Sequence, residues 1–338
     1  MPRPAGDQAS GDAGIRLAVV GFGNLGRAAV RLRSLFPDLS LKAIFTRRPP
    51  GAIKGRPRGA RVHHVDEAPG FKGQIDVALL CGGTATDLPE QGPRFASLFN
   101  TVDSFDTHAL IHAYFREMDQ VARAAGTTAV ISTGWDPGLF SLLRVLQESV
   151  LPRGVGYTFW GPGVSQGHSD AARRVPGVAD ARSYTIPVTS VFHEIRRGKR
   201  PRPSPRRQHI RVCYVVPRPG ADRKEIERAI KNLPNYFRGY DTTVTFVSRE
   251  EMENKHSLLP HGGTVLRSGK TSKINRHLME FSLRLDSNPE FTAGVMLAYA
   301  RAAFRLNREG VTGARTVLDI APAYLSARAP RDLMERVI

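Results

Sequence analysis

The 338-residue sequence predicts an α/β protein: a doubly wound parallel sheet combined with a second α+β domain built on a mixed sheet. Three observations lead to this fold class. Strand and helix patterns alternate through about the first 135 residues, as in a parallel sheet with crossover helices. A glycine-rich turn joins the first strand pattern to a helix pattern. From about Tyr157 onward, alternating strand patterns dominate and helices become few.

The first strand pattern, which begins at Ile15, ends in a GxGxxG turn followed by a helix pattern from Arg27. The first glycine permits a tight turn, the second lets the backbone approach phosphates, and the third lets helix and strand pack closely. The free N–H groups at the helix N-terminus favour an anion. Because strand and helix flank the motif, we expect a Rossmann-type pyrophosphate site rather than an ordinary glycine-rich turn. Its residues are Gly21, Phe22, Gly23, Asn24, Leu25 and Gly26.

The second strand pattern, Leu39–Phe45, ends in Thr46, Arg47 and Arg48. A site for the unphosphorylated cofactor usually has Asp or Glu here, about 20 residues after the motif, to hold the ribose 2′-hydroxyl. Two guanidinium groups and a hydroxyl suit a 2′-phosphate instead. The alternative is an exposed basic turn in a basic protein. We therefore predict NADP as the cofactor.

Three further strand ends are expected at the same edge of this sheet. Ile75–Cys81 is a buried strand pattern that runs into a glycine and threonine loop, and Asn100–Asp106 and Ala129–Asp136 each end in an aspartate, with a helix pattern over 108–125 between them. Ligands of open α/β sheets bind beside such ends, so Asp106 and Asp136 should face the nicotinamide. Asp136, which precedes Pro137, could instead be a turn former. The expected cofactor contacts from these ends are Cys81, Gly82, Gly83, Thr84, Ala85, Thr86, Ser104, Phe105, Asp106, Thr133, Gly134, Trp135, Asp136 and Pro137.

The second half of the chain predicts the mixed sheet and a return to the first domain. Strand patterns cover 184–186, 209–216, 242–247 and 277–285, and helical spacing covers 222–231. A long helix over 289–307 has Asn288 as its expected N-cap, and a last strand over 316–320 precedes a short helix near Asp332. The expected division is an N-terminal extension over 1–14, a dinucleotide-binding domain over 15–135 that is completed by about 290–338, and a second domain over 136–289.

Composition excludes several classes of protein. No apolar run approaches the ~18 residues of a membrane span. The first 14 residues lack the apolar core of a secretion signal, so we expect a cytoplasmic protein. Cys81 and Cys213 lie in apolar strand patterns, as buried thiols of a reducing compartment would, and no metal-ligand spacing involves them.

The net charge of +18 raises the alternative of a basic nucleic-acid-binding protein with a vestigial nucleotide fold. The densest basic run, Arg196–Arg207, contains three prolines and no aromatic residue. It therefore lacks a platform on which bases could stack, and we expect a solvated loop. The charge of the whole chain can still attract an anionic cofactor. We expect no nucleic-acid partner.

Candidate reactive groups are spread over both domains. They include no GxSxG motif and no cysteine–histidine arrangement, which leaves the difficult chemical step to the cofactor. Each has a structural alternative: the tryptophans could be core aromatics, Arg211 could face inward or outward, His261 could lie in a flexible loop, and Asn288 could only cap a helix. The candidates are Asp106, Trp135, Asp136, Trp160, Gln166, His168, Thr185, Arg211, His261 and Asn288.

Seven segments together resemble the meso-diaminopimelate dehydrogenase family, in the same order from about Ile15 to the C-terminus. They are 21–27, 85–91, 101–106, 132–138, 158–163, 165–170 and 260–263, of which Ser-Thr-Gly-Trp-Asp-Pro-Gly and Ser-Gln-Gly-His-Ser-Asp are the most specific. The resemblance implies reversible, NADP-dependent oxidative deamination at the D-centre of meso-2,6-diaminopimelate, giving L-2-amino-6-oxopimelate and ammonia. It also implies a cytoplasmic homodimer that serves lysine and peptidoglycan precursor synthesis, with the second domain binding substrate and forming the dimer.

The resemblance also assigns residue roles. It implies that Asp106 and Asp136 hold the reacting amino group, and leaves open which of them accepts the proton. The remaining implied substrate contacts are backbone at Gln166 and Gly167 for the D-centre carboxylate, Trp160 as a pocket wall, Thr185, Arg211 and His261 for the distal carboxylate, and Asn288 beside them. The segments 196–207 and 268–273 depart from the family pattern and are expected to be loops. The rival within enzymes is a broader NADP-dependent D-amino-acid dehydrogenase, or a dihydrodipicolinate- or homoserine-type oxidoreductase.

Overall fold

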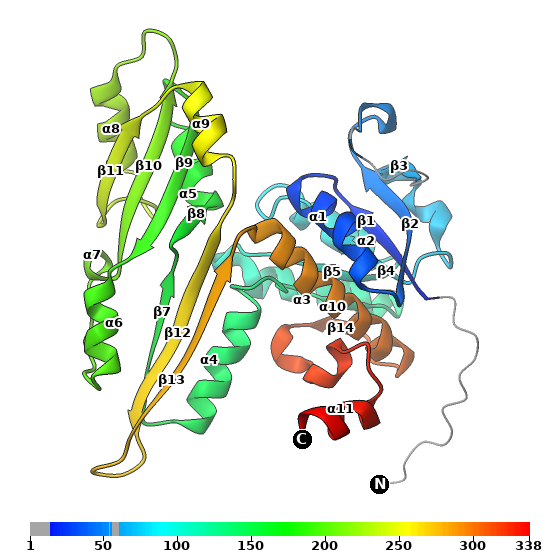
Figure 1. Ribbon diagram of the computed structural model, residues 1–338. Helices are drawn as coiled ribbons and strands as arrows, with labels where there is room; N and C mark the ends of the chain where they lie inside the picture. Colours follow the sequence, from blue (N-terminus) through cyan, green and yellow to red (C-terminus); the bar gives the residue numbers. More distant parts are fainter. Residues whose placement is uncertain (1–13, 54, 56–60) are drawn as a thin grey trace. The chain divides into compact units, whose positions relative to one another are not determined.

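The chain divides into two compact units (Figure 1). The computed structural model describes residues 14–53, 55 and 61–338, so all but the last residue of the expected N-terminal extension lies outside the described residues. Unit 1 comprises the described residues up to Ser141 together with Pro289–Ile338, and unit 2 comprises Leu142–Asn288. The chain therefore passes from unit 1 to unit 2 inside helix α4, Leu139–Val150, whereas the sequence-based boundary lay between residues 135 and 136.

Unit 1 contains the predicted doubly wound sheet. Its seven strands lie in the order β14-β6-β5-β4-β1-β2-β3, and every pair is parallel. The order reverses between β1 and β4, which is where ligands bind in such sheets. The strands are β1 Ile15–Val20, β2 Leu39–Thr46, β3 Val62–His64, β4 Val77–Leu80, β5 Asn100–Asp103, β6 Thr128–Val130 and β14 Gly313–Arg315.

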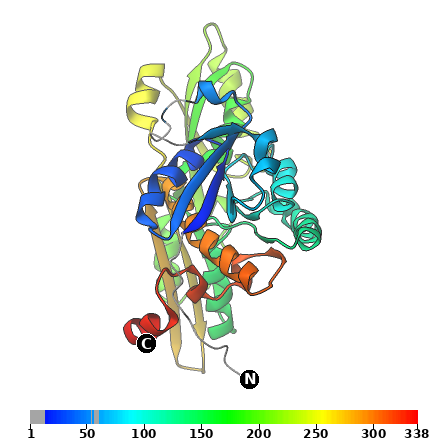
Figure 2. The same ribbon diagram turned by 90° about the vertical axis from the view of Figure 1, so that its right-hand side faces the viewer.

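Helices cover both faces of this sheet. Helices α2 and α3 pack with Ala18, Val20 and Leu80 on one face, and α1 lies on the other (Figure 2). The central strands β1 and β4 are hydrophobic almost throughout, as expected for parallel strands buried on both sides. The α-helices of this unit are α1 Asn24–Leu32, α2 Leu88–Ala96, α3 Ile111–Ala125, α10 Asn288–Arg308, which begins at the last residue of unit 2, and α11 Pro330–Val337.

The predicted last strand over 316–320 is wrong. Strand β14 ends at Arg315, and Val317–Asp319 form a 3-10 helix. The Thr316 hydroxyl accepts the Leu318 N–H at 3.2 Å, and the Asp319 carboxylate accepts the Thr316 N–H at 2.7 Å. These local side-chain hydrogen bonds give the backbone an alternative to a strand ladder.

Unit 2 contains two sheets where the sequence predicted one. The four-stranded sheet β11-β10-β9-β8 is mixed, as predicted, because β10 and β11 are parallel and the other pairs antiparallel. The three-stranded sheet β13-β12-β7 is antiparallel and was not predicted as a separate layer. The strands are β7 Val155–Trp160, β8 Gly163–Ser165, β9 Val178–Pro187, β10 His209–Pro217, β11 Asp241–Phe246, β12 His261–Lys270 and β13 Arg276–Leu285.

Two segments expected to be loops are partly regular. In the basic run, Pro205 begins the short helix α7, Pro205–Gln208, because proline is tolerated in the first turn. In the second segment, β12 continues to Lys270, with Ser268 and Gly269 paired to β13. The other helices of the unit are α5 Gln166–Arg173, α6 Thr189–Arg196, α8 Arg223–Lys231 and α9 Arg249–His256.

The two cysteine thiols are buried, as the sequence predicted. Cys81 and Cys213 are free and buried, and burial raises the pKa of each thiol to about 12. Within residues 14–53, 55 and 61–338, no helix combines the length and hydropathy needed to cross a bilayer. The same residues contain no cluster of three or more metal-ligating side chains.

Candidate functional site

The glycine motif forms the turn between β1 and α1 that the sequence predicted. Gly21 has a φ of +91°, and a Cβ at Gly26 would collide with the Gly21 carbonyl oxygen, so each position needs glycine. A Cβ at Gly23 would meet no atom within 4 Å, which leaves open space above the turn. Helix α1 begins at Asn24 without a side-chain cap, so its first N–H groups remain available to an anion.

The two arginines after β2 lie beside this turn in different electrostatic surroundings. The Arg48 guanidinium donates to the Phe22 carbonyl oxygen at 2.7 Å, and the Arg48 backbone N–H donates to the buried Thr46 hydroxyl at 3.1 Å. Arg47 forms an ion pair with Asp87 at 2.6 Å. The Asp87 carboxylate, which the sequence reasoning missed, therefore partly neutralises Arg47, whereas the two hydrogen bonds of Arg48 involve neutral groups.

The loops after β4 and β5 are joined by Thr84. Its hydroxyl accepts the Asp106 N–H at 2.9 Å and lies 3.3 Å from the Thr107 hydroxyl. Asp87 also accepts the Gly83 N–H at 3.0 Å, which ties the glycine loop to the start of α2. Each loop that was expected to contact the cofactor is thus connected to its neighbour by side-chain hydrogen bonds.

Asp106 and Asp136 both belong to unit 1 and follow neighbouring strands. Asp106 is exposed and Asp136 is half-buried. Desolvation raises the pKa of the Asp106 carboxyl, and its hydrogen bond with Thr84 opposes this shift only in part. Trp135 is buried, with its ring packed edge-on against Phe140 at 5.2 Å between centroids.

In unit 2, the two residues expected to bind a carboxylate through their backbone begin a helix. Gln166 and Gly167 are the first residues of α5, and both are exposed. The Ser165 side chain does not cap the helix but bonds the His168 ring nitrogen at 2.7 Å. The first N–H groups of α5 are therefore available to an anionic group.

Arg211 points into the buried side of its sheet, which resolves the alternative that the sequence left open. It pairs in register with Thr185 of β9 and donates to the Thr185 hydroxyl at 2.5 Å. Its guanidinium lies 4.2 Å from the Tyr240 ring centroid, and its buried Nε has no hydrogen-bond partner. Arg211 is only 4% exposed, and burial lowers its pKa. A buried guanidinium with an unpaired N–H is poised for an anion.

Three histidines lie within electrostatic range of Arg211. Burial, followed by the Arg211 charge, lowers the pKa of His168 to about 3 and that of His209 to about 4. Burial also lowers the pKa of His261 to about 4. At neutral pH all three rings are therefore uncharged, and Arg211 supplies the positive charge of this cluster.

His209 is a residue that the sequence reasoning missed. It is fully buried, its Nε2 accepts the Trp160 N–H at 2.9 Å, and its ring lies 5.5 Å from the Trp160 ring. The sequence did contain a signal for His209, because alternation along β10 places His209 and Arg211 on the same face. His261 begins β12 and so does not lie in a loop, and the Asn288 N–H donates to the Leu259 carbonyl at 3.0 Å at the start of α10.

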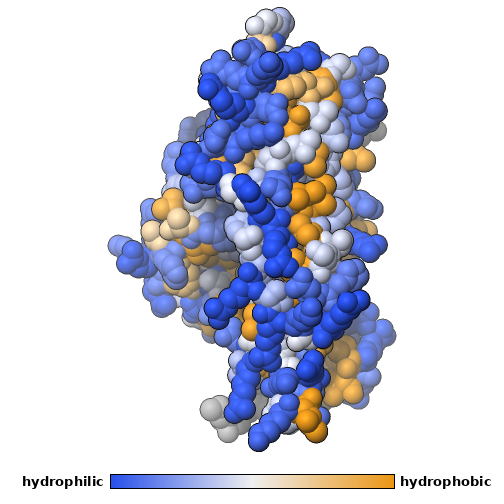
Figure 3. Space-filling view, turned by 90° about the vertical axis from the view of Figure 1, so that its left-hand side faces the viewer, coloured by the Kyte–Doolittle hydropathy of each residue, from blue (hydrophilic) through white to orange (hydrophobic). Residues whose placement is uncertain are grey.

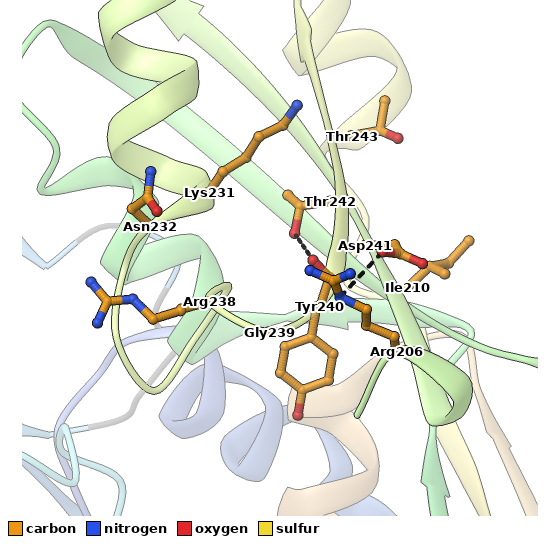
Figure 4. A pocket seen from close by; sticks show the side chains of 10 residues that line it. All are labelled: Arg206, Ile210, Lys231, Asn232, Arg238, Gly239, Tyr240, Asp241, Thr242 and Thr243. Atoms are coloured by element: carbon orange, nitrogen blue, oxygen red, sulfur yellow. Dashed lines mark hydrogen bonds and ion pairs between the residues drawn. The ribbon is translucent and has the colours of Figure 1, made fainter. Parts of the chain in front are cut away.

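A cavity of about 540 Å³ opens near Tyr240, at the start of β11 (Figure 4). It is basic, with Arg206 paired to Asp241 at 3.6 Å and Lys231 paired to Glu227 at 2.6 Å. None of the predicted site residues lines it. Tyr240, whose ring lies against the Arg211 guanidinium, lines the cavity, which therefore adjoins the buried Thr185–Arg211 pair.

Known proteins are similar to this chain over part or nearly all of its length. A family model for the C-terminal domain of diaminopimelic acid dehydrogenase matches residues 134–287. The meso-diaminopimelate D-dehydrogenase of Acetivibrio thermocellus is 53% identical over 96% of this chain and 98% of its own length.

Two solved structures are similar over the same length. A meso-diaminopimelate dehydrogenase mutant of Clostridium tetani, crystallised with DAP, has a TM-score of 0.92 and 47% identity over 96% of this chain and all of its own. An engineered D-amino acid dehydrogenase bound to NADP+ has a TM-score of 0.86 and 40% identity over 96% of this chain and all of its own.

Proposed function

The chain belongs to the meso-diaminopimelate D-dehydrogenase family, and from this premise we propose that it deaminates meso-2,6-diaminopimelate oxidatively at the D-centre. The reaction is reversible and consumes water and NADP+, and it gives L-2-amino-6-oxopimelate, ammonia, NADPH and a proton. The observation that carries the choice of substrate is Arg211, buried with an unpaired Nε beside Thr185. This arrangement suits a second carboxylate, which simple D-amino acids lack.

NADP fits the residues of unit 1. The open space at Gly23 and the uncapped start of α1 suit the pyrophosphate, and Arg48 suits the 2′-phosphate. When bound, the nicotinamide takes up the hydrogen of the reacting carbon with its electron pair. The strand-end loops, of which Thr84 is the connecting residue, are expected to enclose the nicotinamide end.

Asp106 and Asp136 act on the amino group at the reacting centre. The ammonium must lose a proton before the carbon–nitrogen double bond can form, and a carboxylate can accept it directly or through water. We assign this proton to Asp106, whose backbone is held by the Thr84 hydroxyl and whose carboxyl has a raised pKa. Asp136 then holds the amino group in place. The open N–H groups at Gln166 and Gly167 bind the neighbouring carboxylate.

The substitutions of the Clostridium tetani mutant support the assignment of the substrate-contacting residues. Its six substitutions replace Gln, Thr, Arg, Pro, His and Asn. This chain has the same six residue types in the same order and at the same spacings, at Gln166, Thr185, Arg211, Pro260, His261 and Asn288. Five of these were candidate substrate contacts from the sequence, and Pro260 is the addition.

The assembly is proposed to be a cytoplasmic homodimer formed through unit 2. Val145, Leu146 and Val150 of α4 and Leu278 of β13 are large apolar side chains at least 41% exposed. An interrupted hydrophobic stripe also crosses the mostly hydrophilic face drawn in Figure 3. Light scattering behind size exclusion should give twice the mass of one chain, and a single-chain mass would contradict the dimer.

The deciding experiment compares the three stereoisomers of diaminopimelate with NADP+. We expect NADPH formation with the meso isomer and none with the L,L isomer, which has no D-centre. A broader D-amino-acid dehydrogenase would instead turn over D-alanine or D-lysine with comparable kcat/KM. A vestigial fold would show no turnover, with salt-dependent binding in a nucleic-acid shift assay.

Replacing Arg211 with Met tests the distal site. Met keeps much of the volume but removes the charge, so the substrate carboxylate loses a charge-assisted hydrogen bond of about 1.5–3 kcal/mol. The KM for diaminopimelate should therefore rise roughly ten- to a hundred-fold while the Kd for NADPH, measured by fluorescence, stays unchanged. Arg206→Met is the control, because Arg206 is exposed and paired to Asp241, and it should leave both constants unchanged. An unchanged KM in Arg211→Met would remove this residue from the site.

A further inference from the structure

Asp103 is a fully buried carboxylate at the end of β5, and no function assigned so far involves it. Its Oδ1 accepts the Phe105 N–H at 2.9 Å and the Ser132 N–H at 3.0 Å. Its Oδ2 accepts the Tyr114 hydroxyl at 2.8 Å. Every one of these donors is neutral, and no cation faces the carboxylate among the described contacts. Burying a carboxylate without a counter-charge is costly, so its retention here needs a reason.

The partners of Asp103 belong to the two loops that carry the candidate catalytic aspartates. Phe105 directly precedes Asp106, and Ser132 begins the segment that leads to Asp136. The backbone carbonyl of Asp103 also accepts the Thr133 N–H at 2.9 Å and the Thr133 hydroxyl at 2.7 Å. One residue thus contacts both loops through its side chain and its backbone.

The surroundings of Asp103 are built to hold this arrangement. Ser132 has a φ of +57°, which is unfavourable for a residue with a Cβ, and its hydroxyl donates to the Phe105 carbonyl at 2.8 Å. The Tyr114 ring stacks on Phe105 with centroids 4.1 Å apart. A Cβ at Gly92 of α2 would collide with the Tyr114 hydroxyl, so glycine there leaves room for it.

We propose that Asp103 is a positioning residue that holds the Asp106 loop and the Asp136 loop in one fixed arrangement. The proposal rests on the proposed function only in the roles of those two aspartates. The Asp103 carboxylate does not touch substrate in this assignment. It acts by fixing the backbone from which the two reacting side chains project, and misplacement of such groups by about 1 Å can cost roughly a hundred-fold in rate.

The pH dependence of kcat distinguishes a positioning role of Asp103 from a merely structural one. Burial raises it to about 6, against the hydrogen bonds from Phe105, Ser132 and Tyr114, which lower it. Tyr114 is the only titratable partner of the carboxylate among these contacts. Protonation as the pH falls through about 6 weakens the bonds to both loops. Tyr114→Phe removes one donor to the carboxylate, so the acid limb of kcat should move to higher pH.

The test compares Asp103→Ala, Asp103→Asn and Asn100→Ala. Asn100 is the matched control, because at the other end of β5 it accepts the Thr128 N–H at 2.8 Å and donates to the Asp76 carbonyl at 2.9 Å. We expect kcat to fall about ten- to a hundred-fold in Asp103→Ala and to recover only in part in Asp103→Asn, whose amide oxygen still accepts N–H groups but, like the protonated acid, carries no charge. Asn100→Ala should lower the Tm but leave both kcat and the Kd for NADPH unchanged.

Amide hydrogen exchange keeps the outcome independent of the substrate. Asp103→Ala should raise exchange over 104–107 and 131–136 together, and Asn100→Ala should not. A wild-type kcat in Asp103→Ala, or unchanged exchange in either loop, overturns the proposal, as does an equal loss of kcat in Asn100→Ala. If Asp103→Ala does not fold, an acid limb that stays in place in Tyr114→Phe overturns it. If the wild-type protein lacks activity with diaminopimelate but Asp103→Ala still raises exchange in both loops, the result contradicts the proposed function and not the positioning role of Asp103.

Discussion

Arg47 and Arg48 are neighbours in the sequence, yet the fold gives them different roles. Arg47 is paired with Asp87, whereas Arg48 donates to the neutral Phe22 carbonyl beside the glycine turn. We expect Arg48→Ala to weaken NADP+ binding by about 1.5–3 kcal/mol, roughly ten- to a hundred-fold, and to leave NAD+ binding nearly unchanged. Arg47→Ala is the matched control with a smaller effect. Fluorescence titration with both cofactors measures this, and an unaltered NADP/NAD ratio in Arg48→Ala would place the 2′-phosphate elsewhere.

His209 permits a prediction about pH. Its pKa is lowered from 6.5 to about 4, so folding favours the neutral ring. This contribution to stability is fully present above about pH 6.5 and is lost as the pH falls toward about 4. His209→Gln keeps an acceptor for the Trp160 N–H but does not titrate. The Tm of this variant should therefore fall less between pH 6.5 and 4 than that of the wild type.

The control for this measurement is His112→Gln, at an exposed position of α3. It should show the wild-type dependence of Tm on pH. Equal slopes for His209→Gln and the wild type would mean that the buried ring does not resist protonation.

These residues also show what a sequence can reveal at this scale. The glycine turn is local, because strand, turn and helix are consecutive, and so its geometry was predicted residue by residue. Arg211 was recognised as a candidate, but its direction depends on how β10 pairs with β9. The role of His209 depends on its contact with Trp160, which lies 49 residues away in the sequence and belongs to the other sheet of unit 2. Contacts between segments that are distant in the sequence therefore cannot be predicted from the pattern of either segment alone.

At the scale of elements, helix α10 is joined to β2 through an ion pair. Arg301 of α10 is 3% exposed and donates to both Asp38 oxygens, at 2.5 and 2.6 Å, just before β2. Desolvation alone would raise the pKa of Asp38, but the hydrogen bonds and charge of Arg301 hold it below its usual value. Removing Arg301 would leave Asp38 without this partner.

We expect Arg301→Met to lower the free energy of unfolding by about 1–3 kcal/mol at neutral pH, because Arg301 is buried but the Asp38 side chain is 32% exposed. The matched control is Arg31→Met, which breaks an exposed pair with Glu290 on the same helix and should cost about 0–1 kcal/mol. Because the pKa of Asp38 is lowered, the pair stabilises the fold above about pH 3.8 and the difference from wild type shrinks as the pH falls below that value. Urea unfolding measures both variants, and equal losses would contradict the importance of burial.

The elements that were mispredicted share a physical cause. The strand expected over 316–320 met the side-chain hydrogen bonds of Thr316 and Asp319, which favour a turn of helix. The first three residues of the loop expected over 268–273 became strand because they pair with β13, and the pattern of one strand does not reveal its partner. The second sheet of unit 2 was missed for the same reason. Strand patterns predict that strands exist, and long-range pairing decides how many sheets they form.

For the whole molecule, the net charge of +18 distinguishes the two proposed ligands. NADP+ is anionic because of its pyrophosphate and 2′-phosphate, whereas meso-diaminopimelate has two carboxylates and two ammonium groups and so has no net charge at neutral pH. A long-range field attracts only the charged ligand, and salt screens it, with a Debye length that falls from ~30 Å at 0.01 M to ~10 Å at 0.1 M. The field and the local contacts can therefore be separated by varying the salt concentration.

We expect the KM for NADP+ to rise steadily between about 0.01 and 0.3 M salt, over which screening increases most, while the KM for diaminopimelate changes much less. NAD+, which lacks the 2′-phosphate, should show a shallower slope than NADP+ and serves as the matched control. Arg48→Ala should raise the KM for NADP+ at every salt concentration but keep a similar slope, because one charge of the 49 basic residues changes the total field little. Equal salt dependence of both substrates would mean that binding depends on local contacts and not on the charge of the whole chain.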